Sequence, residues 1–314
     1  MKTYARFIIY TDDIPGGADA ILGLTGRRKD VAEVTAMGTV YLALEEHDER
    51  IAKVAALLQE AGKSPSPSWY WDEYTEEEYQ AAPLLWIFRW SSAGMWTGPG
   101  YGVTYDMSQA CPACFTGVRQ ASPLIVDGTE LLKANKHRVS STLYDDLLVR
   151  DTDVEKLIAA NVAGANFWPV TARYKSGATG EIRWQQAVID HVLPPMTAST
   201  CLDETSRCPT CRRGIRSEQT TSRTRRCTYR REDLKDICDF NLSWEQFGLF
   251  GDPKTGDSPQ EGVPHARPHP WVFITPKVMN LLRGKTKKEQ KYQGCGFTPI
   301  WIEDDTHDKP YLMT

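Results

Sequence analysis

The chain has 314 residues, of which 41% are hydrophobic and 25% are charged, and its formal net charge at pH 7 is -4. These values are typical of a globular protein, exclude a disordered or low-complexity chain, and give no charge excess that would indicate a partner. No apolar run approaches the roughly 18 to 20 residues of a membrane-spanning helix, and the first residues lack the features of a signal peptide. We therefore expect a cytoplasmic protein without membrane association, built from two or three domains.

Residues 1–66 predict a small α/β unit. The alternation from Tyr4 to Tyr10 is typical of a strand, and a second strand is expected from Val34 to Leu44. Asp48 is a suitable cap for a helix with apolar residues at helical spacing, which Gly62 ends. Between the two strands, the glycines within residues 15–29 predict a loop.

A serine- and proline-rich segment, residues 64–68, predicts a linker and the first domain boundary. Beyond it, the capping box Thr75–Glu78 predicts a short helix that Pro83 ends. Leu84 to Trp90 is then expected to form a strand.

A strand–helix–strand pattern follows in the middle of the chain. Asp146–Arg150 predicts a strand, and a capping box at Thr152–Glu155 begins a helix over Val154–Asn161. Asn166–Val170 predicts the start of the next strand.

The same order returns near the C-terminus. Trp271–Ile274 predicts a strand, Thr275 caps a helix with Pro276 at its first position, and Gly296–Ile300 predicts the closing strand. The closing segments read N-F-W-P-V and G-F-T-P-I, so they share the phenylalanine and the proline. We interpret the two patterns as degenerate copies of one module.

Each pattern is preceded by a pair of cysteines in the motif C-P-x-C-x-x-G, at Cys111–Gly117 and Cys208–Gly214. The motif and its strand–helix–strand define two predicted modules, residues 67–200 and 201–314. With the N-terminal unit, the sequence predicts an α+β protein whose two β-α-β modules are joined by a four-cysteine, zinc-ribbon-like centre.

The chemistry of the paired motifs indicates zinc. A C-P-x-C turn brings two thiolates to one point, and two such turns complete the tetrahedral sulfur set that Zn²⁺ prefers. Four cysteines leave no coordination position for a substrate, so the ion is expected to be structural. The predicted ligands of this single zinc ion are Cys111, Cys114, Cys208 and Cys211.

Alternative roles stay open for several cysteines and histidines. A thioredoxin-like redox role for the CxxC pairs is disfavoured, because glycine-containing turns follow both pairs and no helix is expected there. The four cysteines outside the motifs are interpreted as buried apolar residues, with Cys201 or Cys227 as an alternative ligand; they are Cys201, Cys227, Cys238 and Cys295. His265 and His269 lie among prolines and are expected in a solvated loop.

A basic stretch follows the second motif and supports an alternative function, binding of nucleic acid. It contains Arg212, Arg213, Arg216, Arg223, Arg225, Arg226, Arg230 and Arg231. No phosphate-binding loop, nucleophile elbow or HExxH helix occurs in the sequence, so an enzyme is the third alternative and no catalytic residue is predicted.

The two C-P-x-C motifs and the final F-T-P-I-W-I segment resemble the double-CxxCG proteins known from myxobacteria, over roughly residues 100 to 305. In that family, a glycine follows the second cysteine directly; here Phe115 and Arg212 stand at this position. Some members are classed as immunity proteins of polymorphic toxin systems. The resemblance implies a non-catalytic protein that neutralises a cognate bacterial toxin by binding it. Asp72–Glu78 and Glu303–Asp305 are the acidic candidates for such a contact.

Overall fold

The computed structural model describes residues 1–12, 14–25, 31–89, 92–95, 97–128, 137–142, 145–200, 204–216, 226–247, 269–286, 289–290 and 293–313. The chain forms two compact units, the first comprising Met1–Glu76 with Gln219–Arg226 and the second Glu77–Glu218 with Cys227–Thr314. Helices and strands occur in both units, which confirms the predicted mixed composition. Within the described ranges, no helix is long and apolar enough to cross a bilayer.

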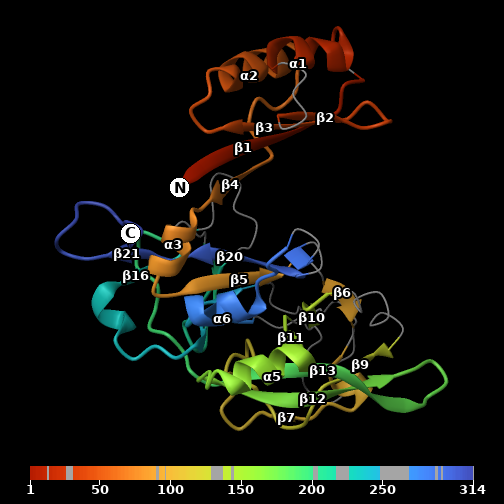
Figure 1. The fold of residues 1–314 in the computed structure, drawn as a ribbon, viewed down its shortest axis with the longest axis vertical. Helices are drawn as coiled ribbons and strands as arrows, with labels where there is room; N and C mark the ends of the chain where they lie inside the picture. Colours follow the sequence, from red (N-terminus) through yellow and green to blue (C-terminus); the bar gives the residue numbers. More distant parts are fainter. Residues whose placement is uncertain are drawn as a thin grey trace. The chain divides into compact units, whose positions relative to one another are not determined.

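The first unit is a four-stranded antiparallel sheet, in the order β2-β3-β1-β4, with two helices on one face (Figure 1). Ala5, Phe7 and Ile9 alternate along β1 and are buried in its core, where Ile21 and Val54 of the helices pack. Its elements are β1 (Lys2–Ile9), α1 (Gly17–Thr25), β2 (Ala32–Val34), β3 (Val40–Glu45), α2 (Arg50–Glu60) and β4 (Trp69–Glu73).

Three features of this unit differ from the sequence-based expectations. The strand expected from Val34 to Leu44 is a hairpin, because Gly38 adopts a positive φ of 78° in the turn between β2 and β3. The expected loop contains α1, which buries Ile21. The first compact unit also extends past residue 66, because β4 returns to pair with β1. The expected cap is present in part: the Asp48 carboxylate accepts a hydrogen bond from the Arg50 amide at 2.9 Å.

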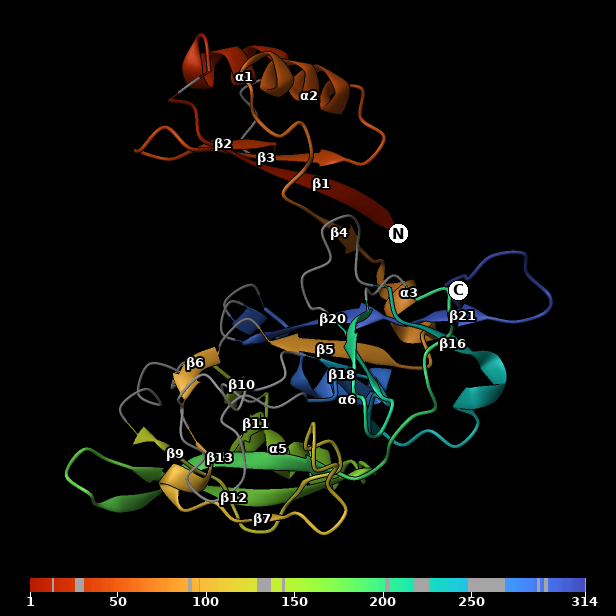
Figure 2. The same ribbon diagram turned by 180° about the vertical axis from the view of Figure 1, so that it is seen from behind.

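The second unit contains two main sheets, with the orders β6-β10-β11-β13-β12-β9 and β17-β19-β5-β20 (Figure 2). The predicted strand–helix–strand patterns are present as β11-α5-β12 and β19-α6-β20. The helices are α3 (Glu76–Ala81), η1 (Pro99–Tyr101), α5 (Asp151–Ala159), η2 (Arg231–Leu234) and α6 (Pro276–Leu282). The strands are β5 (Leu85–Arg89), β6 (Ser92–Met95), β7 (Tyr105–Asp106), β8 (Arg119–Gln120), β9 (Ile125–Asp127), β10 (Val139–Thr142), β11 (Leu147–Arg150), β12 (Ala165–Arg173), β13 (Thr179–Ile189), β14 (Glu204–Arg207), β15 (Gly214–Arg216), β16 (Thr228–Arg230), β17 (Phe240–Leu242), β18 (Gln246–Phe247), β19 (Val272–Ile274), β20 (Cys295–Pro299) and β21 (Trp301–Glu303).

The two main sheets have the same arrangement of four central strands. β10-β11-β13-β12 and β17-β19-β5-β20 are both antiparallel throughout. In each, a helix joins the second strand to the fourth, but the third strands differ in origin: β13 follows β12 directly in a hairpin, whereas β5 lies far before β19 and β20 in the chain. Because β5 precedes the first cysteine motif and completes the second sheet, the two sheets are not separated by a boundary at residue 200.

The connections before the fourth strands match as well. Gly164 before β12 and Gly294 before β20 have positive φ values of 89° and 81°. The carbonyl of the residue before each glycine accepts a hydrogen bond from the other main sheet: the Phe240 amide donates to the Ala163 carbonyl, and the Val139 amide donates to the Gln293 carbonyl, each at 3.0 Å.

Two further strand pairs of this unit are parallel. β9 runs parallel to β12 at the edge of the first main sheet, with Ile125 opposite Thr171, whereas β16 runs parallel to β21 in a separate two-stranded sheet, with Thr228 opposite Trp301. One hydrophobic core includes residues of both main sheets together with Val154 and Leu157 of α5 and Val278 of α6. Apolar burial therefore joins the sheets into one unit.

Candidate metal centre

The four cysteines of the two motifs converge in the second unit. All four sulfur atoms lie within 4.8 Å of one another. Cys111 and Cys208, the first cysteines of their motifs, have their Sγ atoms 3.7 Å apart, and the Sγ atoms of the second cysteines, Cys114 and Cys211, are 3.5 Å apart. These distances exclude disulfides, whose sulfurs are about 2.05 Å apart.

Both motifs occupy the tip of a short hairpin. The first lies between β7 and β8, in which Asp106 is opposite Arg119, and the second lies between β14 and β15, in which Arg207 is opposite Gly214. Two hairpins that each present a cysteine pair are the arrangement of a zinc ribbon.

The two turns have the same internal hydrogen bonds. In the first turn, the Cys111 amide donates to the Thr116 carbonyl at 2.9 Å, and the Phe115 amide donates to the Cys111 carbonyl at 2.8 Å. In the second turn, Cys208 donates to Arg213 and Arg212 donates to Cys208, both at 3.0 Å. The matching sequence motif therefore gives matching backbone geometry.

The residue after the second cysteine is left-handed in both turns. Phe115 has a φ of 59° and Arg212 a φ of 63°, a region that costs a residue with a side chain roughly 1–2 kcal/mol. At this position, the double-CxxCG proteins that the motifs resemble have a glycine. Gly117 is also constrained, because a Cβ there would lie 2.6 Å from the Gln109 carbonyl oxygen.

Two of the sulfur separations are close to those of a tetrahedral four-sulfur metal site, and all six are no more than 4.8 Å. With Zn–S bonds of about 2.3 Å, the edges of a sulfur tetrahedron are about 3.8 Å long. The observed separations of 3.7 and 3.5 Å are close to that value. Cys114 and Cys208 are almost fully buried and Cys111 is 9% exposed, whereas Cys211 is exposed.

The protein environment acts differently on the buried thiols. Burial raises the pKa of Cys114 to about 12. Burial also acts to raise the pKa of Cys208, but the amide N–H groups of Cys211 and Thr210 stabilise its thiolate and lower the pKa to about 7. A bound cation would favour the thiolate of every ligand and release protons on binding.

The remaining cysteines lie elsewhere. Cys227 and Cys295 are buried in separate hydrophobic cores, and Cys238 is partly buried. Cys201 lies outside the described residues. Among the residues that the structure places, these four cysteines form the only metal-ligating cluster, so the alternative of Cys227 as a ligand is wrong.

The histidine expectation is wrong in part. His265 lies outside the described residues, but His269 is not in a solvated loop. Its side chain is 17% exposed, and its Nε2 lies 2.5 Å from the Asp145 carboxylate. Asp145 has a φ of 63°, next to the start of β11. No sequence signal paired these two residues, because they are distant in the chain and lie in different motifs.

The basic stretch does not form one uniform cationic surface in the described part of the chain. Three of its arginines have acidic partners: Arg226 lies 3.4 Å from Asp72, Arg230 is 3.7 Å from Glu232, and Arg231 is 3.1 Å from Asp304. Arg212 and Arg213 belong to the second turn. Arg223, Arg225 and the side chain of Arg216 lie outside the described parts.

Several acidic residues of the two expected contact surfaces, Asp72–Glu78 and Glu303–Asp305, are buried or form hydrogen bonds within the protein. The Asp72 side chain is 2% exposed and accepts a hydrogen bond from Thr3 at 2.6 Å. Asp304 accepts hydrogen bonds from Thr306 and Tyr311, which hold its pKa below the usual range. Glu78 is buried.

Comparisons of the chain with models of protein families, with curated proteins and with solved structures gave no match.

Proposed function

We propose that Cys111, Cys114, Cys208 and Cys211 bind one structural zinc ion. The observation that carries this proposal is the convergence of four sulfurs, at separations close to a tetrahedral edge, from two turns with the same hydrogen bonds. A reducing cytoplasm, where thiols persist, suits such a centre. Four thiolates complete the coordination of zinc, so the ion would stabilise the fold without performing chemistry.

The matching sheets support the interpretation of two degenerate copies of one module. Each copy would consist of a leading strand, a cysteine hairpin and a strand–helix–strand. β5 leads the first copy but completes the second sheet, and β13 leads the second copy but completes the first sheet. The copies would therefore exchange their leading strands, and zinc would fasten the two hairpins together.

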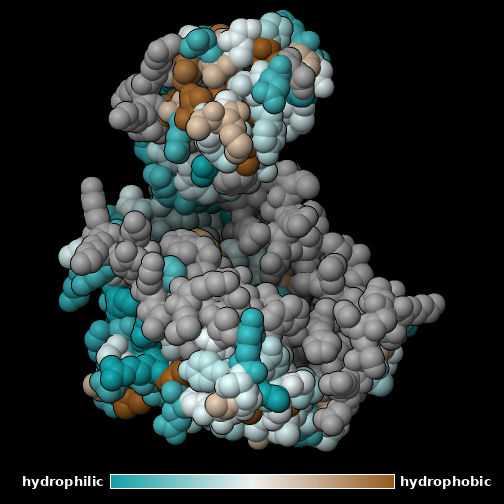
Figure 3. Space-filling model, turned by 90° about the vertical axis from the view of Figure 1, so that its right-hand side faces the viewer, coloured by the Kyte–Doolittle hydropathy of each residue, from teal (hydrophilic) through white to brown (hydrophobic). Residues whose placement is uncertain are grey.

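For the molecular role, we propose a non-catalytic protein-binding protein, and in particular an immunity protein that binds a cognate toxin. Its support is the closed centre, the resemblance of the motifs, and the exposed apolar side chains of the first unit. Tyr10 is 67%, Val34 42% and Met37 85% exposed. Figure 3 views the side of this unit where the β2–β3 turn lies, and hydrophobic atoms gather on it. The acidic segments contribute little support, because Asp72 and Asp304 accept hydrogen bonds within the protein and Glu78 is buried.

The zinc proposal is tested by metal analysis and substitution. We expect about one zinc per purified chain and, for Cys111→Ser/Cys208→Ser, loss of the metal and unfolding at lower denaturant concentration. Cys238→Ser is the matched control, because this cysteine lies outside the cluster, and it should retain zinc. Zinc near zero in the wild type, or a double variant as stable as the wild type, would contradict the proposal.

The immunity role is tested by co-expression. A toxin encoded beside this gene should be neutralised by the wild-type chain, and Met37→Asp should weaken rescue if the exposed apolar surface makes the contact. Glu60→Gln, a change at an exposed position of α2, should rescue like the wild type. Full rescue by Met37→Asp would exclude this surface, and failure of the wild type would exclude the immunity role against that toxin.

A further inference from the structure

A cavity of about 500 Å³ lies beside the candidate metal centre, between the two main sheets of the second unit. Phe115 and Arg213 of the two cysteine turns line one side. Trp168 of β12, Gln246 of β18 and His269 line other parts of the wall. Its volume falls within the roughly 300–1,000 Å³ that is usual for small-ligand pockets.

Gln246 offers a hydrogen-bond acceptor to this cavity. The residue is 5% exposed, and its amide nitrogen donates to the Glu245 carbonyl at 3.3 Å. Its amide oxygen accepts no hydrogen bond from the residues that the structure describes, so it is able to accept one from an N–H group of a ligand.

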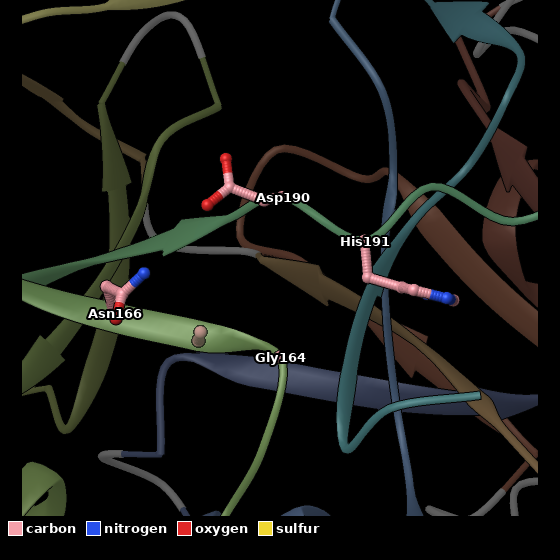
Figure 4. Close-up of a pocket in the computed structure, with 5 residues that line it drawn as sticks. Gly164, Asn166, Asp190 and His191 are labelled. Atoms are coloured by element: carbon pink, nitrogen blue, oxygen red, sulfur yellow. The ribbon is translucent and has the colours of Figure 1, made fainter. Parts of the chain in front are cut away.

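Asp190 and Asn166, which are both exposed, add two polar groups to the wall of the same cavity. Both also line an adjoining hollow of about 400 Å³. Figure 4 shows Asn166 on β12 and Asp190 directly after the end of β13, while the His191 ring points away from them. His191 instead contacts the Asn241 side chain at 2.8 Å. Within the described residues, the Asp190 carboxylate has no ion-pair partner.

An aromatic ring accompanies these acceptors. Trp168 and Asn166 are two residues apart on β12, so their side chains leave the strand on the same face. Trp168 is partly buried and lines the cavity. The face of an indole ring attracts organic cations, guanidinium above all.

The other charged groups of the wall have partners within the protein. Asp145 contacts His269, and Asp146 accepts a hydrogen bond from Thr142 at 2.6 Å. The Arg213 guanidinium lies over the Trp244 ring, 5.1 Å from its centre.

Arg119, the second cation of the wall, is opposite Asp106 in the β7–β8 pair. Asp190 is therefore the carboxylate whose charge is available to a ligand.

We propose that this cavity binds a guanidinium group. Asp190 would neutralise its charge, the amide oxygens of Gln246 and Asn166 would accept its N–H groups, and the Trp168 ring would cover one face. The guanidinium could belong to a free small molecule or to an arginine side chain of a protein partner. The second source rests on the proposed protein-binding function, whereas the first does not.

The test is calorimetric titration of the purified full-length chain with agmatine and with N-acetyl-arginine amide. N-acetyl-citrulline amide, which has a similar shape without the charge, is the ligand control. We expect binding of both guanidinium compounds and at least tenfold weaker binding of the citrulline compound. Tighter binding of an arginine-containing peptide than of agmatine would assign the site to a protein partner, and the reverse order would assign it to a free ligand.

Variants connect the binding to the cavity. Asp190→Asn should weaken binding about tenfold, which corresponds to ~1.4 kcal/mol, and Gln246→Leu should also weaken it. Glu181→Gln, an exposed change on β13 outside the cavity, should bind like the wild type. Equal binding of the citrulline compound, unchanged binding by Asp190→Asn, or no binding of either guanidinium compound at 10 mM would overturn the proposal. Zinc content, measured on each variant, separates this outcome from failure of the metal proposal.

Discussion

The two main sheets of the second unit place similar elements in similar positions but support their helices by different means. The third residue of α5 is Asp153, whereas the third residue of α6 is Val278; both are buried. Asp153 has a bidentate bond to Arg138, at 2.6 and 3.0 Å, and Arg138 also donates to the Leu281 carbonyl of α6 at 3.0 Å. Val278 packs in the core without any polar bond. One helix position therefore depends on an ion pair and the other on apolar packing.

The first prediction concerns a substitution that breaks the ion pair between Asp153 and Arg138. Asp153→Asn should lower the free energy of unfolding by about 3–5 kcal/mol, because it leaves the Arg138 charge partly buried without its partner. Urea unfolding followed by tryptophan fluorescence would measure the loss. Lys156→Met, which removes the exposed second partner of Asp153, should cost at most about 1 kcal/mol. A loss for Asp153→Asn no larger than that of Lys156→Met would contradict the prediction.

The same pair predicts a pH dependence. Although burial acts to raise the pKa of Asp153, hydrogen bonds from Arg138 and Lys156 outweigh it and lower the pKa below its usual value. The pair therefore stabilises the fold fully above the unfolded-state pKa of about 3.9, and this contribution is lost as the pH falls through the folded-state pKa. Asp153→Asn should reduce the acid sensitivity of stability in that range. An unchanged acid dependence would show that other carboxylates determine it.

The second prediction addresses what the sheets share. Alanine at Gly164 or Gly294 should cost about 2–4 kcal/mol, through the positive φ and a close backbone contact. A Cβ at Gly164 would lie 2.4 Å from the Phe240 carbonyl oxygen, and a Cβ at Gly294 would lie 2.0 Å from the Val139 carbonyl oxygen. Gly177 has a φ of 82° with open space around it, so Gly177→Ala isolates the conformational cost, about 1 kcal/mol. Similar losses at all three positions would exclude the close contacts as the cause.

The smallest expected effect concerns the cysteine turns. Arg212→Gly should raise the free energy of unfolding of the metal-loaded protein by about 0.5–1 kcal/mol, because it relieves a left-handed conformation. Thr210→Gly, in the same turn but without a positive φ, should be neutral or destabilising. Phe115→Gly tests the equivalent position, where lost packing against the cavity should reduce the gain. Destabilisation by Arg212→Gly would show that its side chain makes a larger contribution than its strain.

Local sequence patterns predicted the parts of the second unit whose determinants are local. The C-P-x-C spacing identified the four clustered cysteines, and helical periodicity identified α5 and α6. The predicted caps are present only in part: Thr275 stands at the N-cap position of α6, but α5 begins at Asp151, before the predicted capping box, and neither helix has a side-chain cap hydrogen bond. The place of β5 in its sheet was not predictable in this way. Leu84–Trp90 was predicted as a strand, but its neighbours β19 and β20 are chosen by packing across a long sequence separation. The contact between His269 and Asp145 was not predicted either, because these two residues are also far apart in the sequence.

The pairing of β5 with strands near the C-terminus also has a consequence for synthesis of the chain. β5 is completed early, but its neighbours β19 and β20 are complete only when residues 274 and 299 have been made. Before residue 274, Leu85, Trp86 and Ile87, which end in hydrophobic cores, have neither neighbouring strand to pair with. Contacts at such separation slow folding and leave apolar segments exposed to aggregation. A nascent chain of this protein is therefore expected to need protection until its last strand emerges from the ribosome.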